Sequence, residues 1–305
     1  TTATANVAVG HAALFANTTG AYNTAVGKSA LITNTTASYN TAVGYNALKT
    51  TTTGQQNVAV GGDALDANTT GGDNTAVGTA ALTANTTATG NTAVGISSLG
   101  TNTTGGFNTA VGRLSGSNIT TGRYNVCIGE NSGYTLTTGE FNVYMGYLAQ
   151  ASGGNAIDEI VIAAGNNFIV GKGNNTGFIS PDGGGVYQGN NSTTWSQVSD
   201  RRIKKNIEDN NVGLDAINQI QVKNFEYRTE DEIVDFDNPS SAVVKKEGIQ
   251  LGVIAQEIEE ILPDMVVTES TGVKSVNADN HTWYLVNAVK ELSAQAEELK
   301  SQLGE

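Results

Sequence analysis

The sequence contains only one cysteine, two histidines and no long apolar run, and these scarcities exclude several classes of protein. The single Cys127 excludes a disulfide framework within the chain and a cysteine-rich metal site. His11 and His281 are far apart in the sequence, so we expect neither a metal ion nor another cofactor. No run approaches the roughly 18 apolar residues that a membrane-spanning helix needs, so we expect no membrane insertion.

Basic charge is also scarce. The chain has 16 lysines and arginines against 29 acidic residues, a net charge of -13, so nucleic acid is not an expected partner. Residues 1–199 carry 8 acidic and 5 basic residues, whereas residues 200–305 carry 21 and 11. This change in composition predicts a boundary between two parts of different structure.

The first part is a 17-residue repeat of the kind Asn23-Thr24-Ala25-Val26-Gly27. A unit this short cannot bury a face alone, so neighbouring units must stack, which predicts a β-solenoid shaft or head over residues 1–150. A second apolar pair in each unit, such as Ala30-Leu31, predicts a second short strand. The repeats start at Asn6, Asn23, Asn40, Asn57, Asn74, Asn91, Asn108, Asn125 and Asn142.

Within each repeat, alanine and valine point to opposite faces of the strand. A coil this narrow takes alanine inside, so the Val26 series must pack elsewhere, and we expect another subunit in a threefold assembly, a homotrimer. The recurring asparagines predict hydrogen-bonded ladders. The recurring glycines, such as Gly27 and Gly44, predict a turn with positive φ or close backbone approach. Cys127 occupies the alanine position and is expected to be a packing residue.

Residues 151–199 are expected to break the repeat register and form a β-rich neck, with short strands at 160–162, 168–170 and 178–179. Residues 200–305 predict a small α+β domain. Its expected elements are a helix at 214–220, strands around Phe225 and 249–253, a helix at 254–262 and a hairpin at 265–276. A final helix carries a coiled-coil seam of alternating four- and three-residue spacing, formed by Leu285, Val289, Leu292, Ala296, Leu299 and Leu303.

Three motifs of the second part occur together: Ser199-Asp200-Arg201-Arg202-Ile203-Lys204, Leu251-Gly252-Val253-Ile254-Ala255-Gln256-Glu257 and Lys290-Glu291-Leu292. Together they resemble the endosialidase-type intramolecular chaperone found at the ends of phage tail spikes and fibres. The repeats resemble the heads of trimeric autotransporter adhesins and repeats of phage tail fibres. The resemblance implies a domain at 200–305 that registers three chains and then cleaves itself off.

By this resemblance Ser199-Asp200 is the scissile bond, and Ser199 and Lys204 form the catalytic pair of a Ser-Lys self-cleaving endopeptidase. A lysine can act as general base when neighbouring cations lower its pKa, and Arg201, Arg202 and Lys205 are such neighbours. Attack by the Ser199 hydroxyl on its own carbonyl would close a strained four-membered ring. A serine of another subunit, a lysine-activated water or the Asp200 carboxylate would each avoid this ring.

The leading functional hypothesis is a virion tail fibre or spike, assembled in the host cytoplasm, that attaches to a host receptor such as a glycan or an outer-membrane component. The repeat is already under way at Asn6, so an anchor to other virion parts is expected upstream. A bacterial trimeric surface adhesin and a threonine-rich ice-binding solenoid are the alternatives. The acidic residues Asp63, Asp66, Asp73, Asp158 and Glu159 do not form the separated carboxylate pair of a glycosidase, so no such activity is predicted.

Overall fold

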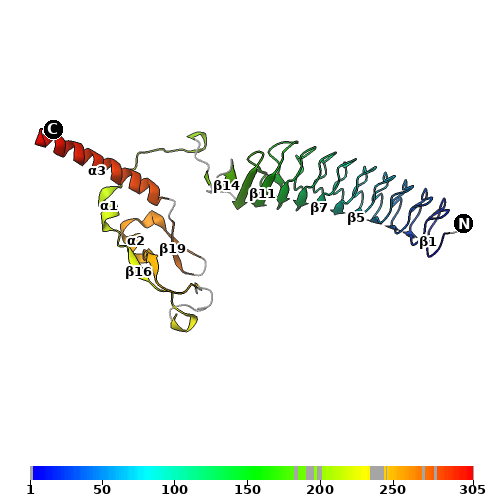
Figure 1. Ribbon diagram of the computed structural model, residues 1–305, viewed down its shortest axis with the longest axis horizontal. Helices are drawn as coiled ribbons and strands as arrows, with labels where there is room; N and C mark the ends of the chain where they lie inside the picture. Colours follow the sequence, from blue (N-terminus) through cyan, green and yellow to red (C-terminus); the bar gives the residue numbers. More distant parts are fainter. Residues whose placement is uncertain are drawn as a thin grey trace. The chain divides into compact units, whose positions relative to one another are not determined.

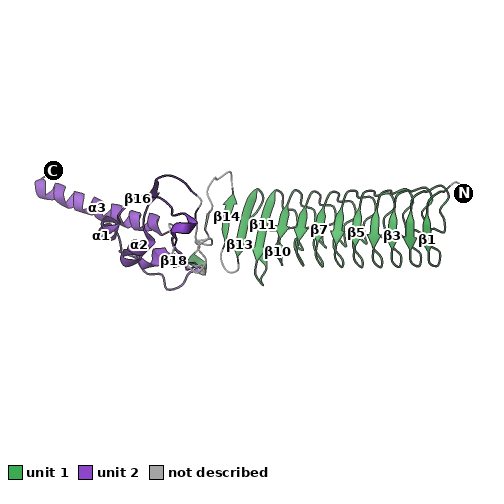
Figure 2. Ribbon diagram, turned by 90° about the horizontal axis from the view of Figure 1, so that it is seen from below, with its two compact units in different colours: residues 1–203 green, residues 204–305 purple. Residues whose placement is uncertain are grey.

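The computed structural model describes residues 3–181, 185–189, 196–197, 201–233, 244, 246–269, 272–277 and 280–304. The chain divides into two compact units, Thr1–Ile203 and Lys204–Glu305 (Figure 2). The three-part division predicted from the sequence, at 1–150, 151–199 and 200–305, stays a prediction.

The first unit is a β-solenoid, as predicted, in which each coil contributes a three-residue strand to one long sheet (Figure 1). Every strand pairs in parallel with the strand 17 residues further on, so that Val9 lies beside Val26 and Val26 beside Val43. The strands of the nine repeats are β1 Val7–Val9, β2 Thr24–Val26, β3 Thr41–Val43, β4 Val58–Val60, β5 Thr75–Val77, β6 Thr92–Val94, β7 Thr109–Val111, β8 Val126–Ile128 and β9 Val143–Met145.

The second strand predicted for each repeat is wrong for the first eight repeats, and only the ninth has one, β10 Ala149–Gln150, among the described residues. The Ala30-Leu31 pair lies in a turn, and Leu31 has a φ of 50°. A left-handed conformation costs a leucine about 1 kcal/mol. It also turns the side chain into the core, where Leu31 is fully buried, and burying a leucine contributes about 2 kcal/mol. The equivalent Leu48, Leu65, Leu82 and Leu99 repeat this conformation, so it is the corner of the coil.

The strand residues point as the sequence predicts. Ala25 and Ala42 are fully buried, whereas Val77 and Val94 on the opposite side of the strand remain 36% exposed. A coil closed by single alanines is narrow, and its outer face is left aliphatic.

The repeating asparagines form the predicted ladder through the core. The backbone N–H of Asn40 donates to Oδ1 of Asn23 at 3.0 Å, and the Asn40 Nδ2 donates to the Gly54 carbonyl at 2.9 Å. Both asparagines are buried. Each asparagine thus satisfies one backbone donor and one backbone acceptor that the turns would otherwise leave unpaired.

The glycine after each strand is required by both geometry and space, as predicted. Gly27 has a φ of 136°, and a Cβ there would lie 2.3 Å from the carbonyl oxygen of Gly44 in the next coil. A side chain at this turn would therefore force the coils apart.

The register does not break after residue 150. Val143 pairs with Ile160 and Ile160 pairs with Gly177, again 17 residues apart, so the expectation of a register change was wrong. The short strands expected in this region are present. The elements are β10 Ala149–Gln150, β11 Glu159–Ala164, β12 Ile169–Val170, β13 Thr176–Pro181, β14 Val186–Gly189 and β15 Ser196–Gln197, of which β14 and β15 pair antiparallel.

The alanine and leucine of the repeat are lost from the last repeats onwards because the core is filled by other side chains. Cys127 and Tyr144 take the inward alanine position, and on the opposite side Gly116 and Gly133 take the leucine position. A Cβ on Gly133 would lie 2.5 Å from the Cys127 sulfur, so the glycine makes room for the larger side chain. Cys127 is buried, and burial raises the pKa of its thiol to about 12, as befits the packing residue predicted.

The second unit has the predicted α+β content. Two antiparallel pairs, β16 with β17 and β18 with β19, accompany three helices around a small core formed by Ala216, Ile258, Leu262, Met265 and Tyr284. Its elements are α1 Leu214–Gln219, β16 Lys223–Phe225, the 3-10 turn η2 Glu230–Glu232, β17 Gln250–Gly252, α2 Ala255–Ile261, the 3-10 turn η4 Pro263–Met265, β18 Val266–Thr268, β19 Lys274–Val276 and α3 His281–Leu303.

The predicted C-terminal helix is present as α3, which buries Tyr284 and Ala288 against the unit. The residues of the predicted coiled-coil seam lie on its exposed side, where Leu292 is 56% and Leu303 77% exposed. The hydroxyl of Tyr284 donates to the Asp264 carboxylate at 2.5 Å, and Asn280 donates to the same carboxylate at 3.1 Å. These bonds attach the start of α3 to η4.

A second ladder of inward side chains gives a first prediction. Asn34 Nδ2 donates to Asn17 Oδ1 at 2.9 Å, but the next position is Thr51, and Asn34 Oδ1 is buried without a hydrogen bond. Thr51→Asn should supply the missing donor and raise the free energy of unfolding by about 1 kcal/mol. Denaturant unfolding followed by strand circular dichroism measures this. Thr51→Val, the matched control, should lower it, and equal destabilisation by both would refute the ladder.

The bond from Tyr284 to Asp264 gives a second prediction. Burial, and then this carboxylate, raise the pKa of Tyr284 to about 12. The folded unit therefore holds this proton more tightly than the unfolded chain. The contribution of the protonated Tyr284 to the free energy of unfolding is full below the ordinary tyrosine pKa of about 10 and is lost as the pH rises towards 12.

Tyr284→Phe should destabilise the second unit, and its difference from wild type should shrink between about pH 10 and 12. Urea unfolding followed by the helical circular dichroism signal of the intact chain measures this. The exposed Tyr227→Phe serves as control and should follow the wild-type curve. A difference that is constant with pH would show that the bond does not act through this proton.

Candidate functional site

The predicted cleavage site lies at the junction of the two units. Ser199 and Asp200 fall outside the described residues. The described part begins with the 3-10 turn η1, Arg201–Ile203, after which Lys204 starts the second unit. The geometry between the predicted nucleophile and base is therefore not part of the described structure, and their catalytic roles stay predictions.

The basic residues after the predicted scissile bond are all exposed. Arg201, Arg202, Lys204 and Lys205 fall within five residues along the chain, on and just after a single turn of 3-10 helix. This placement keeps several positive charges close to one another in water. The supporting role predicted for Arg201, Arg202 and Lys205 stays a prediction.

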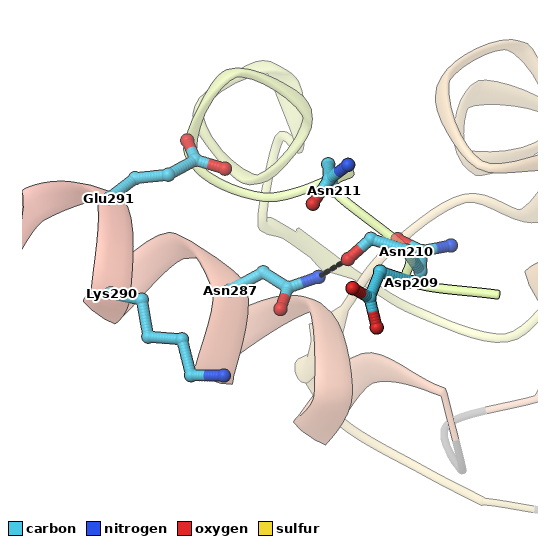
Figure 3. A pocket seen from close by; sticks show the side chains of 6 residues that line it. All are labelled: Asp209, Asn210, Asn211, Asn287, Lys290 and Glu291. Atoms are coloured by element: carbon cyan, nitrogen blue, oxygen red, sulfur yellow. Dashed lines mark hydrogen bonds between the residues drawn. The ribbon is translucent and has the colours of Figure 1, made fainter.

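The segment after Lys205 is held by helix α3. Asn287 Nδ2 donates to the carbonyl oxygens of Asn210 and Val212 at 2.8 and 3.1 Å, and the Glu291 carboxylate accepts the backbone N–H of Leu214 at 3.0 Å. Figure 3 shows Asn287 and Glu291 projecting from one face of α3 into a polar hollow. The C-terminal helix thus fixes the start of α1 and the chain that leads into it.

Sequence reasoning included Lys290-Glu291-Leu292 in the family resemblance but did not find this role. Asn287 and Glu291 are four residues apart, and that spacing places them on one face of a helix. Their spacing was the available signal. Their partners were not readable because they are backbone groups about 75 residues away in the sequence.

The motif from Leu251 to Glu257 runs from β17 into α2 and lies at the edge of the small core, against which Val253 packs. The buried residue of this helix is Ile258, directly after the motif. Lys223 on β16 and Lys274 on β19 pair with Glu257 and Glu259 of α2, so ion pairs join the helix to both strand pairs.

A buried carboxylate in the solenoid was not predicted. Glu159 takes the asparagine position of the ladder in β11 and is fully buried, whereas its neighbour Asp158 is exposed. It accepts hydrogen bonds from the Tyr144 hydroxyl at 3.0 Å, the Ser152 N–H at 3.0 Å and the Gly173 N–H at 2.9 Å. Burial, and then the Glu159 charge, raise the pKa of Tyr144, which keeps this hydroxyl a donor. Glu159 is thus bound within the core and is not placed to act on a substrate.

Exposed aromatic rings form two separate stacks on the turn before the strands. Phe107, Tyr124 and Phe141 stack with centroids 5.2 and 5.0 Å apart, and Tyr22 stacks on Tyr39 at 5.1 Å. These stacks stabilise adjacent coils and leave ring edges at the surface.

Within the described ranges, no group of three His, Cys, Asp or Glu residues could hold a metal ion. Among the described helices, none is both long and apolar enough to cross a membrane.

Comparison with known proteins now adds to this geometry. Residues 199–267 match the peptidase S74 family, described as chaperone of endosialidase. The long tail fiber protein Gp37 of Salmonella phage S16 is 30% identical over 166 residues, which are 50% of this chain and 21% of that protein. The chain therefore spans about a fifth of the length of this relative. It is a homologue of a phage long tail fibre protein, and at residues 199–267 it carries a domain of the endosialidase chaperone family.

Proposed function

We propose that this chain is part of a virion tail fibre or spike, a homotrimer whose solenoid forms the shaft or receptor-facing part and whose C-terminal domain directs folding and then removes itself. The observation that carries the proposal is the family match that begins at Ser199, the first residue of the predicted scissile bond. A domain of this family implies a self-cleaving chaperone. The similarity to a phage long tail fiber protein favours the virion tail over a bacterial surface adhesin.

The proposed reaction is hydrolysis of the Ser199-Asp200 peptide bond. The C–N bond breaks, the hydroxyl of a water molecule ends on the Ser199 carbonyl carbon, and a proton ends on the Asp200 nitrogen. Lys204 acts as the base that accepts the proton of an attacking water or hydroxyl or, on the Asp200 route, of the water that hydrolyses the anhydride formed. Because Ser199 cannot attack its own carbonyl without a four-membered ring, that group is a water oriented by Ser199, the Asp200 carboxylate or a serine of another subunit.

The repetitive surface of the solenoid explains why a chaperone domain is needed. From β2 to β7 the outward strand positions hold only threonine and valine, so a second chain displaced by one coil would meet nearly the same surface. Repeats of this kind specify their register weakly. A terminal domain that joins the chains supplies the register, and its removal leaves a shaft whose stability is kinetic.

We propose that attachment to a host receptor, a glycan or an outer-membrane component, is the purpose of the fibre. The exposed aromatic stacks and the threonine-rich turns are the surfaces through which the solenoid can bind the receptor. Assembly takes place in the host cytoplasm and the product is part of the virion tail, joined to upstream virion parts.

The cleavage makes a third prediction. The wild-type chain should appear as fragments of 199 and 106 residues, whereas Ser199→Ala and Lys204→Ala should remain whole at 31.5 kDa because the proposed base or its partner is missing. Intact mass spectrometry measures this. Lys246→Ala, an exposed lysine of the same unit, is the control and should be cut like wild type. A wild-type chain that stays whole after folding would remove the peptidase role.

Two further variants separate the three routes. Asp200→Asn should still be cut if water attacks and should stay whole if the Asp200 carboxylate attacks. Coexpression of Ser199→Ala with Lys204→Ala should restore cutting if a serine of one subunit acts on another.

A further inference from the structure

The outer face of the long sheet carries one row that is wholly apolar and a second row that mixes threonine with valine. The eleven strands β1 to β9, β11 and β13 lie side by side in parallel (Figure 2). In each of them two outward residues align with those of the next strand, so that the sheet carries two rows. Paired residues of consecutive coils form each row. The first row is Val7, Thr24, Thr41, Val58, Thr75, Thr92, Thr109, Val126, Val143, Ile160 and Gly177, and the second is Val9, Val26, Val43, Val60, Val77, Val94, Val111, Ile128, Met145, Ile162 and Ile179.

Neither row contains a charged residue, although charges stand on the turns beside it. Lys28, Arg113 and Glu130 each follow a strand by two residues, and Asp73 precedes one by two residues. Arg113 and Glu130 pair across adjacent coils at 2.6 Å, so this border is occupied by charges bonded to each other. An uncharged centre between charged margins is the usual layout of a protein–protein interface.

The exposed strip is large for a chain that remains alone. Eleven coils at about 4.8 Å each give a length of about 50 Å, and two rows of side chains give a width of roughly 10 Å. The resulting area of about 500 Å² is near the upper end of the patches that monomers expose, and it approaches the roughly 800 Å² that each partner contributes to a stable complex.

The regular repeat of side chains along each row indicates which partner fits this surface. A surface that repeats every coil fits best against another surface with the same repeat, and a second copy of this chain carries one. Helix α3 supplies an independent indication, because its exposed Leu285, Val289, Leu292 and Leu299 follow coiled-coil spacing. Parallel copies are the simplest assembly that can use both surfaces.

We infer that the outward rows of this sheet are the surface on which further copies of the chain dock, in parallel. This inference rests on the proposed homotrimer and names the part of the solenoid that its subunits share. The docked copies cover the half-exposed valines and leave the turn columns, with their threonines and aromatic rings, facing outwards.

The test replaces two valines of one row with lysine. Val94→Lys with Val111→Lys places buried charge in the interface, so the solution mass of the folded chain should fall to one third of the wild-type mass. Thr104→Lys with Thr121→Lys, in exposed turns of the same two coils, is the matched control and should keep the wild-type mass. Analytical ultracentrifugation gives the mass, and circular dichroism shows that the strands are retained.

The possible results distinguish a failure of the proposed docking surface from a failure of the proposed trimer. A trimeric wild type with a trimeric valine variant would overturn the surface alone. A folded monomeric wild type would overturn both the surface and the trimer, and thermal hysteresis of that monomer would assign the rows to ice. Fragment masses report cleavage independently of either result.

A milder pair of variants keeps the inference testable if lysine prevents folding. Val9→Cys and Ile179→Cys, each in a Cys127→Ala chain, are coexpressed and treated with a short bismaleimide. Parallel docking predicts links of residue 9 to 9 and of 179 to 179. Links of 9 to 179, or none between chains, would overturn it.

Discussion

The structure depends on the hydrogen bonds that asparagine side chains make between coils. A turn-rich chain that stacks coils of single alanines buries many backbone groups that no strand can pair. Asn23, Asn40 and their equivalents pair one donor and one acceptor per coil, because successive asparagines are 17 residues apart and lie beside one another. The same constant length aligns the glycine turns and the left-handed corner leucines of successive coils.

Much of the solenoid could be predicted because its repeat is a chemical pattern. The inward alanine, the outward valine and the asparagine ladder are visible in the residues themselves. The conformation of Leu31 was not, because nothing in its chemistry distinguishes a strand leucine from a corner leucine. The continued register after residue 150 was hidden for a different reason: Tyr144 and Glu159 replace the alanine and asparagine while the backbone pairing stays the same.

The helices and strands of the second unit could also be predicted, but the contacts between them could not. Its helices and strands follow periodic patterns, and its motifs resemble one family, but the contacts that unite it join distant segments. Glu291 to Leu214 and Tyr284 to Asp264 are such contacts, and no periodicity indicates them. The roles of Ser199 and Lys204 came from resemblance alone, because spacing along a chain does not give a distance between two side chains.

Glu159 changes the direction of hydrogen bonding in the asparagine ladder. An amide both donates and accepts, so an asparagine ladder can continue from coil to coil, whereas an ionised carboxylate only accepts. At this coil Gly173 donates to the side chain, where Gly54 and its equivalents accept from one. The column of amides therefore ends at Glu159, and at this coil the bond between side chain and turn runs in the opposite direction. The turn after β11 presents an N–H to the core where the earlier coils present a carbonyl oxygen.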